Sequence, residues 1–405
     1  MVRRIGSAGF LLVLLMVLAG GAIGAPLHAE GAEALSYREL GITHGAHLRP
    51  TLGYGDEVLD FDALVGKDIG VVMYFAEWNH MPGDHALDAY LPNIIQGQIT
   101  DPSRRPAIML TWEPTRAATG LFPQYDTAFG CTQSYPGLVI PPQDIIDGNC
   151  DVYLNIFRDD LKARPERILL RFAHEMNITD SPWWPRHFGL TEDASLYVAM
   201  YQHVYDVIMY EPGAPTNVEW VWSPNWASNP PVAWNAIPNY YPGDAYVDWI
   251  GLSGYNWYNS PPPPDELWRD FDYLYDGVLT DLTCRYAKPQ IIAEVGSVEG
   301  NGTTLSKADW IAELYQRAPE YPFVRSVVWF NDFAGANPGL ADFRVTTGTA
   351  ASGSVSQLPA ATGTWTNAYS TAIADPVYTT TLPSLSAATP PHPICMELFL
   401  PIITR

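Results

Sequence analysis

Eight short apolar runs, each closed by polar or aromatic residues, constrain the fold of this 405-residue chain more than any other feature. The runs are rich in β-branched residues, and they are continuously apolar rather than alternating, which indicates strands buried on both faces. They lie at 41–47, 68–75, 106–112, 167–173, 218–222, 247–253, 289–293 and 324–329. We expect each run to form one strand of a parallel sheet.

Stretches of helical composition fall between these runs. They lie at 86–96, 152–164, 194–210, 267–274 and 307–317, with a last one at 365–374. Asp151 and Ser306 stand where they could cap two of these helices. Strand and helix in alternation, to a count of eight strands, predict an α/β fold of the (β/α)8 TIM barrel type. The alternative, an open doubly wound sheet, would need a Gly-rich phosphate-binding turn after an early strand, and the sequence lacks one there.

The two ends of the chain differ from the middle in composition. Arg3 and Arg4 precede an apolar run over 10–18, and small residues follow, so we expect residues 1–29 to be a secretory signal peptide. The alternative is an uncleaved N-terminal anchor. The predicted catalytic barrel spans 36–378, a Thr/Pro-rich linker 379–393, and a short C-terminal tail 394–405. That tail is too short to cross a membrane, and we expect no membrane span in the mature chain. The predicted location is extracellular, with retention at the cell surface through the tail as an open possibility.

Export would allow the four cysteines of the chain to form disulfide bonds, because such bonds form in oxidising compartments. Cys131, Cys150, Cys284 and Cys395 allow three pairings. Cys131 and Cys150 flank a Pro/Gly-rich loop, and we expect a disulfide between them to staple it. A bond between Cys284 and Cys395 would then tie the tail to the barrel.

The charge balance narrows the classes of partner. The chain has 22 Lys and Arg against 44 Asp and Glu, a formal net charge of −22. Such a surface repels phosphate backbones and anionic membranes, so we expect no nucleic-acid partner. A neutral polysaccharide remains compatible. The 14 Trp and 23 Tyr residues suit it, although most of these aromatic side chains must belong to the core.

Two carboxylates follow the fourth and seventh runs. Glu175 comes just after 167–173, and Glu294 directly after 289–293. In a barrel the ends of the fourth and seventh strands face each other across the mouth, where the active site lies. Glycoside hydrolysis needs two carboxyl groups around the scissile bond, so we predict Glu175 and Glu294 as the catalytic pair. Their placement predicts a separation of roughly 5–5.5 Å and retention of configuration. A single Glu at a strand end is more often a solvated or structurally paired residue; two at these strands favour catalysis.

Other residues at the strand ends could serve this pair. The proton donor must have a raised pKa, which burial against Trp183 and Trp184 would supply. His174 could hydrogen-bond within the site, Tyr255 could donate to the nucleophile, and Arg171 could orient a carboxylate. The candidates for contact with the sugar are these four residues, Trp183, Trp184, His174 and Tyr255, together with Trp112, Glu113, Asn225, Trp257 and Trp329. The chemistry requires neither a metal nor an organic cofactor. The Asn177-Ile178-Thr179 sequon lies so close to the proposed acid that we take it as coincidental.

These residues resemble glycoside hydrolase family 26, one of the retaining barrels with acids on strands four and seven. The resemblance covers roughly residues 40–345 and rests on RFAHEMN (171–177), WSPN (222–225), GLSGYNW (251–257), AEVG (293–296) and VWFN (328–331). It implies that Glu175 is the acid/base and Glu294 the nucleophile. It also implies that Tyr255 positions the nucleophile and that Trp329 stacks under the cleaved sugar.

Two departures from the family pattern bear on the substrate. The family usually has Gly where this chain has Ile178. Its mannanases tend to carry His after the Trp at the end of strand three, where this chain has Glu113 after Trp112, more like the glucanase branch. We therefore expect a secreted, monomeric, retaining endo-β-glycanase that hydrolyses β-1,4 linkages in β-mannan or mixed-linkage β-1,3-1,4-glucan. The alternatives are a non-catalytic glycan-binding barrel and a cell-surface spacer.

Overall fold

A computed structural model describes residues 41–48, 57–78, 99–115, 139–188, 192–210, 212–258, 267–300, 304–334, 341–346 and 364–385. The chain divides into two units, Met1–Ala34 and Leu35–Arg405, and all described residues lie in the second. The predicted signal peptide, the predicted helix at 86–96 and the predicted C-terminal tail lie outside the described residues. Among the described helices, none combines the length and the apolar character needed to cross a membrane.

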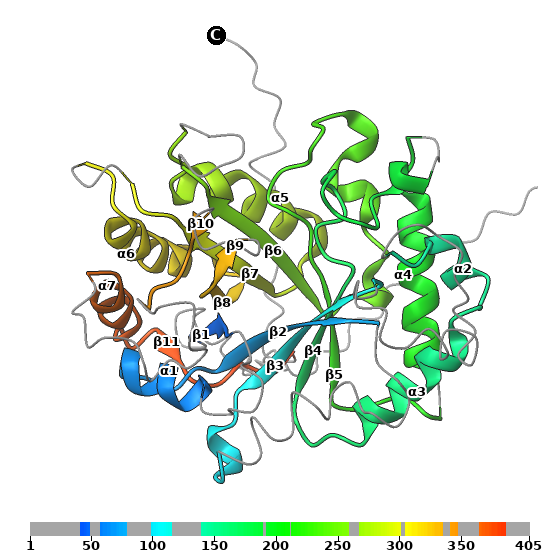
Figure 1. Ribbon diagram of the computed structural model, residues 1–405, viewed down its shortest axis with the longest axis horizontal. Helices are drawn as coiled ribbons and strands as arrows, with labels where there is room; N and C mark the ends of the chain where they lie inside the picture. The colour runs from blue at the N-terminus through cyan, green and yellow to red at the C-terminus, as the bar shows by residue number, and fades with distance from the viewer. Residues whose placement is uncertain are drawn as a thin grey trace, which may run out of the picture. The chain divides into compact units, whose positions relative to one another are not determined.

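Eight parallel strands form a closed barrel (Figure 1). They are β1 (Ile42–His47), β2 (Val71–Glu77), β3 (Ala107–Glu113), β4 (Ile168–Phe172), β5 (Val218–Trp222), β6 (Trp249–Asn256), β7 (Gln290–Ser297) and β8 (Val324–Phe330). Each strand pairs with the next along the chain, and β1 closes the ring against β8 with the pairs Thr43↔Ser326 to His47↔Phe330. The predicted (β/α)8 barrel is confirmed, and each predicted run contains or overlaps one strand.

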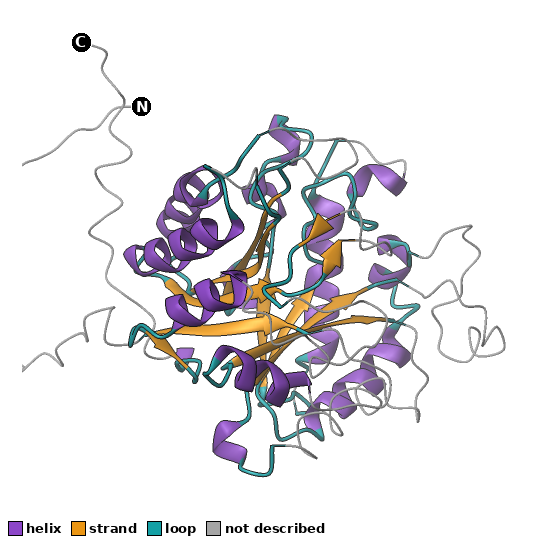
Figure 2. Cartoon of the chain, turned by 60° about the vertical axis from the view of Figure 1, so that its left-hand side comes forward, coloured by secondary structure: helices purple, strands orange, loops and turns teal. Residues whose placement is uncertain are grey.

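Helices surround the strands (Figure 2). The α-helices are α1 (Glu57–Val65), α2 (Pro142–Ile146), α3 (Asp151–Lys162), α4 (Ser195–Ile208), α5 (Gly277–Tyr286), α6 (Lys307–Arg317) and α7 (Thr364–Ile373). A π-helix, η7 (Asp272–Asp276), leads into α5. Short 3-10 helices are η2 (Pro102–Arg104), η3 (Pro185–Phe188), η4 (Ala233–Asn235), η5 (Ile237–Tyr240), η6 (Asp244–Tyr246) and η8 (Ala318–Glu320).

Helix positions agree with the sequence in part. Helices α3, α4, α6 and α7 lie where they were predicted, whereas α1 and α2 were not predicted. The helix predicted at 267–274 is wrong, because helical structure begins only near residue 271 and continues through α5. Ser306 caps α6 by accepting a hydrogen bond from the Asp309 amide. Asp151 is not a cap; it is the first residue of α3, and its carboxylate lies 2.7 Å from His203 Nε2.

Alternation along the strands separates two apolar layers. One cluster fills the barrel interior and includes Val71, Met73, Met109 and Leu169. A larger cluster lies between the strands and the helices and includes Trp112. Both layers exclude water, which is why the strands are continuously apolar.

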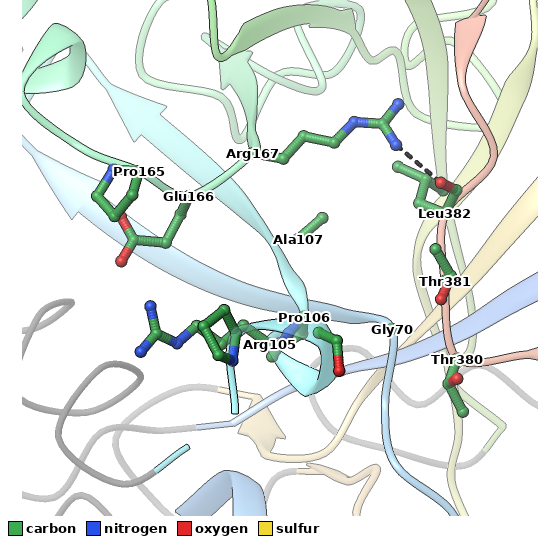
Figure 3. Close-up of a pocket in the computed structure, with 12 residues that line it drawn as sticks. Gly70, Arg105, Pro106, Ala107, Pro165, Glu166, Arg167, Thr380, Thr381 and Leu382 are labelled. Carbon is green, nitrogen blue, oxygen red and sulfur yellow. Dashed lines mark hydrogen bonds between the residues drawn. The ribbon is translucent and has the colours of Figure 1, made fainter. Parts of the chain in front are cut away.

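The barrel base is closed by chain that follows α7. Strand β11 (Tyr378–Thr379) pairs parallel with β1, and Arg167 at the start of β4 donates hydrogen bonds to the Leu382 and Pro383 carbonyls. Figure 3 shows Thr380, Thr381 and Leu382 along one side of a cavity of about 270 Å³ at this base. The first part of the predicted linker, 379–385, packs against the barrel base, and the rest of 379–393 lies outside the described residues, so the linker bounds stay a prediction.

Two of the four cysteines lie in described parts of the chain. Cys150 and Cys284 are both disulfide-bonded. Cys131 and Cys395, their predicted partners, lie outside the described residues, so the pairing stays a prediction.

Candidate active site

Arg171 is the centre of the site at the carboxyl ends of the strands. It lies on the inward face of β4, and its side chain has no exposed surface. Its guanidinium donates to Ser223 Oγ at 2.9 Å, Ser253 Oγ at 2.5 Å and Thr111 Oγ1 at 3.3 Å. Its Nη1 also forms an ion pair with Glu294 Oε2 at 2.6 Å. A buried guanidinium is tolerated only with such partners, so Arg171 ties together the inward faces of four strands.

Glu294 enters the barrel because β7 is irregular. The register between β6 and β7 passes from Leu252↔Ile292 to Ser253↔Glu294, so Ala293 has no partner. A bulge of this kind breaks the alternation of side chains and re-aims the residue after it. Ala293 belongs to the interior cluster, and Glu294 then also points inward. Its second oxygen accepts a hydrogen bond from the Tyr255 hydroxyl, so both carboxylate oxygens are held.

Glu175 is held at the end of β4 by an unusual backbone. Its φ is +53°, in the left-handed region that non-glycine residues rarely adopt, and its amide donates to Ser223 O at 2.7 Å. Its carboxyl group accepts hydrogen bonds from Ser253 and Asn225. Strained conformations of this kind are kept where the surroundings determine them, and here two neighbouring strand ends do so.

The environment of Glu175 favours its protonated form. Burial is the largest cause, and the charge of Glu294 adds to it, while Arg171 and the two hydrogen bonds oppose it. The net effect of these causes raises the pKa of Glu175 to about 7. Ser253 therefore connects the two carboxyl groups, because its hydroxyl accepts from Arg171, the partner of Glu294, and donates to Glu175.

Aromatic rings line the mouth beside these groups. Phe330, the last residue of β8, stacks on His47 with ring centroids 4.9 Å apart. Tyr255 lies 5.7 Å from both Phe330 and Trp257. Phe75, on the inward face of β2, is 37% exposed although it lies within a strand. These rings offer apolar faces next to the carboxyl groups.

His174 and Glu113 lie on the β3–β4 side of the mouth. His174 Nδ1 is 4.0 Å from Glu113 Oε1. Burial and the charge of Arg171 hold the pKa of His174 well below its usual range, so the ring is neutral. Burial, followed by the charges of Glu77 and Glu294, raises the pKa of Glu113 to about 8.

The loops after β4 and β5 are locked together by asparagines. Asn177 accepts from the Asn225 amide at 2.8 Å and donates to the Asn225 carbonyl at 3.1 Å. Asn235 donates to the Asn177 carbonyl at 2.9 Å and accepts from Trp184 Nε1 at 3.2 Å. Asn177 has no exposed surface, which agrees with the interpretation of its sequon as coincidental.

The structure brings together most of the predicted site residues. Glu175, Glu294, Tyr255 and Asn225 are connected by the hydrogen bonds described above, and His174, Glu113 and Trp257 lie beside them. Trp184 packs against Trp234, 5.7 Å away, and the sugar contact predicted for it stays a prediction. Trp183 is 2% exposed and donates to the His174 carbonyl at 2.8 Å, so it supports His174 instead of facing the sugar.

Two further predicted sugar contacts are wrong. Trp112 and Trp329 have no exposed surface, because both point outward into the layer between strands and helices. Trp112 stacks on Phe157 of α3 at 4.1 Å, and Trp329 packs against Trp310 of α6 at 5.9 Å. The inward neighbour of Trp329 is Phe330, which the sequence pattern did not single out.

Phe75, Thr111 and Ser253 were also missed as site residues. Thr111 lies two residues before Glu113 on the same face of β3, so the period-two pattern of a strand could have found it. The same count places Phe75 on the inward face of β2, two residues after Met73 of the interior cluster. The same count places Ser253 on the inward face of β6, two residues before Tyr255, because the irregularity falls in β7 and leaves the alternation of β6 intact.

Comparisons with known proteins agree with this geometry. Residues 154–333 match the model of Glycosyl hydrolase family 26. The chain is 30% identical over 226 residues to Endoglucanase H of Acetivibrio thermocellus, which covers 56% of this chain and 22% of the relative. It is 27% identical over 165 residues to Mannan endo-1,4-beta-mannosidase A and B of Caldalkalibacillus mannanilyticus, which covers 40% of this chain and 28% of that relative.

A solved structure shares the fold. The GH26 β-mannanase from Bacteroides ovatus aligns with a TM-score of 0.56 and 18% identity, over 85% of this chain and 92% of that one. The region that matches the family model contains β4 to β8 and thus both Glu175 and Glu294. Residues 154–333 thus match the model of glycosyl hydrolase family 26, both relatives are similar to this chain over part of their length, and the solved structure shares the barrel fold.

Proposed function

We propose that the protein is a secreted endo-β-glycanase that hydrolyses β-1,4 linkages in a neutral polysaccharide with retention of configuration. The observation that carries this proposal is the hydrogen-bonded connection from Glu294 through Arg171 and Ser253 to Glu175. It gives two carboxyl groups different environments within one site at the carboxyl ends of the strands. One is ion-paired with a buried guanidinium, and the other has a raised pKa. Such pairs of carboxyl groups with separate roles are what glycoside hydrolysis requires.

The proposed reaction has two displacements. First, Glu294 attacks the anomeric carbon while Glu175 gives its proton to the glycosidic oxygen, and the bond between that carbon and oxygen breaks. The leaving sugar departs with a hydroxyl group, and the remaining sugar is esterified to Glu294. Glu175, now ionised, then takes a proton from a water molecule whose oxygen attacks the anomeric carbon. The Glu294 carboxylate is released and the first protonation state is restored.

Tyr255 and Arg171 prepare Glu294 for its role. Both donors approach from the protein side, so the orientation of the carboxylate is fixed before substrate binds. A preoriented nucleophile lowers the barrier because reorganisation is not needed during the reaction. A glycan-binding barrel without catalysis would not need this arrangement, which favours hydrolysis over the binding and spacer alternatives.

The named activities of the relatives guide the proposed substrate. One relative is an endoglucanase and the other a mannan endo-1,4-β-mannosidase. We therefore keep mixed-linkage β-1,3-1,4-glucan and β-mannan as the candidate substrates. The net charge of −22 agrees with a neutral glycan. Export is supported by the basic and apolar start of the chain, and we expect the mature protein to act as a monomer.

Release of reducing sugar by the mature protein tests the proposal. Barley mixed-linkage glucan, galactomannan, glucomannan and β-1,3-xylan are the substrates, and Glu294→Gln is the control variant because it keeps the shape of the side chain. Release from glucan or mannan that disappears in Glu294→Gln supports the proposal. Nuclear magnetic resonance of the first product gives the stereochemistry, and an α-anomer formed first would refute retention.

A second variant tests the acid. Glu175→Ala should reduce hydrolysis of the natural glycan far more than that of an aryl glycoside with a good leaving group, because only the poor leaving group needs protonation. Equal losses on both substrates would contradict the role of Glu175.

A further inference from the structure

The chain that follows β8 returns to the site and places an aromatic ring behind Tyr255. Strands β9 (Phe333–Ala334) and β10 (Ala341–Asp342) form a short antiparallel pair just after β8 (Figure 1). Phe343, the next residue, has no exposed surface. Its ring lies 4.8 Å from the ring of Tyr255, whose hydroxyl donates a hydrogen bond to Glu294. Phe343 therefore supports the tyrosine that holds the proposed nucleophile.

Strand β7 leaves room for this ring. Gly296 lies two residues after Glu294, and a Cβ atom at Gly296 would come within 3.0 Å of the Phe343 Cβ. A side chain at this position would push Phe343 out of place, because a contact of that length is tighter than ordinary van der Waals packing. Such close packing transmits strain, so a small displacement of Phe343 would reach Tyr255.

Lys307, the first residue of α6, holds the backbone on both sides of Phe343. Its Nζ donates to the Asp342 carbonyl at 2.6 Å and to the Arg344 carbonyl at 3.0 Å. The same Nζ lies 3.9 Å from the centroid of the Trp365 ring of α7. The Lys307 side chain is fully buried by these contacts. Because the two carbonyls flank Phe343 in the chain, their bonds to Lys307 fix the path of the backbone there.

A lysine is a costly residue at this position. Burial is the largest cause that lowers the pKa of Lys307 to about 7; Arg344 lowers it further, whereas Asp342 and Glu299 raise it. An apolar side chain of similar volume would pack here without a buried charge. A buried amine that is kept in spite of this cost favours a role in fixing one backbone arrangement over a role in stability.

We propose that Lys307 is a positioning residue, which holds Phe343 against Tyr255 and so keeps the tyrosine hydroxyl on the nucleophile. The effect of Lys307 passes through Phe343 and not through a contact with the substrate. The proposal rests on the proposed function, because it takes Glu294 as the nucleophile. Loss of this support should slow the chemical step and leave substrate binding unchanged, since a misplaced reacting group raises the barrier.

Steady-state kinetics of Lys307→Met, on a glycan that the wild type hydrolyses, tests the proposal. Methionine keeps most of the length of the side chain and removes both hydrogen bonds. We expect kcat to fall about tenfold and KM to stay within about twofold of the wild type. Lys67→Met is the matched control, because Lys67 Nζ also donates to two main-chain carbonyls, those of Ile373 and Tyr378, at 2.6 Å each. These lie at the base of the barrel, so kcat and KM should match the wild type.

Phe343→Leu keeps the test decisive if Lys307→Met does not fold. Leucine fills part of the volume but presents no ring to Tyr255, so kcat should again fall about tenfold. A double-mutant cycle with Tyr255→Phe separates positioning from a general loss of structure. Once the tyrosine hydroxyl is absent, Lys307→Met and Phe343→Leu should each lower kcat by less than about twofold.

A fluorine label on Tyr255 gives a readout that does not depend on turnover. With 3-fluorotyrosine incorporated in place of Tyr255, the 19F resonance reports the packing around that ring. It should shift in Lys307→Met and in Phe343→Leu, because both alter the contact between the two rings. It should stay in place in Lys67→Met.

The outcomes separate this proposal from the proposed function. If the wild type releases sugar, any of four results would overturn the positioning role alone: an unchanged kcat in Lys307→Met or Phe343→Leu, a raised KM in place of a lowered kcat, an equal loss in Lys67→Met, or losses that add fully to that of Tyr255→Phe. Absence of sugar release from every glycan, with a 19F resonance that moves only in Lys307→Met and Phe343→Leu, would overturn hydrolysis and support the hold on Tyr255.

Discussion

The hydroxyl of Ser253 is the most informative group to remove, because it touches both halves of the site. It accepts a hydrogen bond from Arg171 Nη2 at 2.5 Å and donates one to Glu175. The bond to Glu175 favours the ionised carboxylate and lowers its pKa. Ser253→Ala should therefore raise the pKa of Glu175 above its present value of about 7.

The size of the shift follows from the strength of that bond. A hydrogen bond to a charged group contributes about 1.5–3 kcal/mol, and 1.36 kcal/mol corresponds to one pKa unit. We expect the pKa of Glu175 to rise by about 1–2 units. Arg171 also loses a partner while fully buried, so the free energy of unfolding should fall by about 1–3 kcal/mol.

The alkaline limb of the pH dependence of kcat/KM reports the acid of the free enzyme. This limb should move to higher pH in Ser253→Ala. Ser223→Ala is the matched control, because the Ser223 hydroxyl also accepts from Arg171, at 2.9 Å, but does not contact the Glu175 carboxyl group. It should destabilise the protein similarly and leave the limb in place. An unmoved or acid-shifted limb in Ser253→Ala, or equal shifts in both variants, would refute the reasoning.

Three further predictions concern the core, the pH dependence of stability and the base of the barrel. Trp329→Ala should lower the free energy of unfolding by about 3–5 kcal/mol and leave KM of the remaining folded enzyme little changed. Phe330→Ala should instead raise KM and change the free energy of unfolding little. Denaturant titration and steady-state kinetics distinguish the two variants. Glu113 has a pKa of about 8 in the folded protein and about 4.5 when unfolded, so its contribution to stability is fully present below pH 4.5 and is lost as pH rises through about 8. Tm should therefore fall over that pH range, and it should fall less in Glu113→Gln. Arg167→Met should lower stability by about 2 kcal/mol with kcat and KM unchanged, because its partners Glu219 and the Leu382 carbonyl lie at the barrel base; a change in KM would contradict this.

The strands were predictable because each is a local apolar run between polar residues. Their number and order follow from counting, and the barrel follows from their alternation with helices. The helices were less certain. Helix α2, only five residues long, and the π-helix before α5 depend on packing against the strands, which leaves little trace in local composition.

The two catalytic candidates were predictable for a different reason. Strand ends of a barrel meet at one mouth, so residues after the fourth and seventh strands could be placed without coordinates. The sequence predicts less well whether an individual side chain points into the barrel or outward toward the helices. Trp329 and Phe330 are neighbours at a strand end, and composition alone does not say which one points inward. In the structure, Phe330 stacks on His47 at the mouth and Trp329 is buried against α6.

By itself the sequence determined the barrel class, the positions of the strands and the choice of Glu175 and Glu294 as catalytic candidates, because these depend on local patterns and on a general rule of barrel geometry. The tertiary structure alone decided that a bulge at Ala293 turns Glu294 inward, that Ser253 joins it to Glu175 through Arg171, and that His174 stands unpartnered at Nδ1 beside Glu113. These features depend on register and on contacts between residues up to 123 positions apart, as for Arg171 and Glu294, and a local pattern carries no information about such contacts.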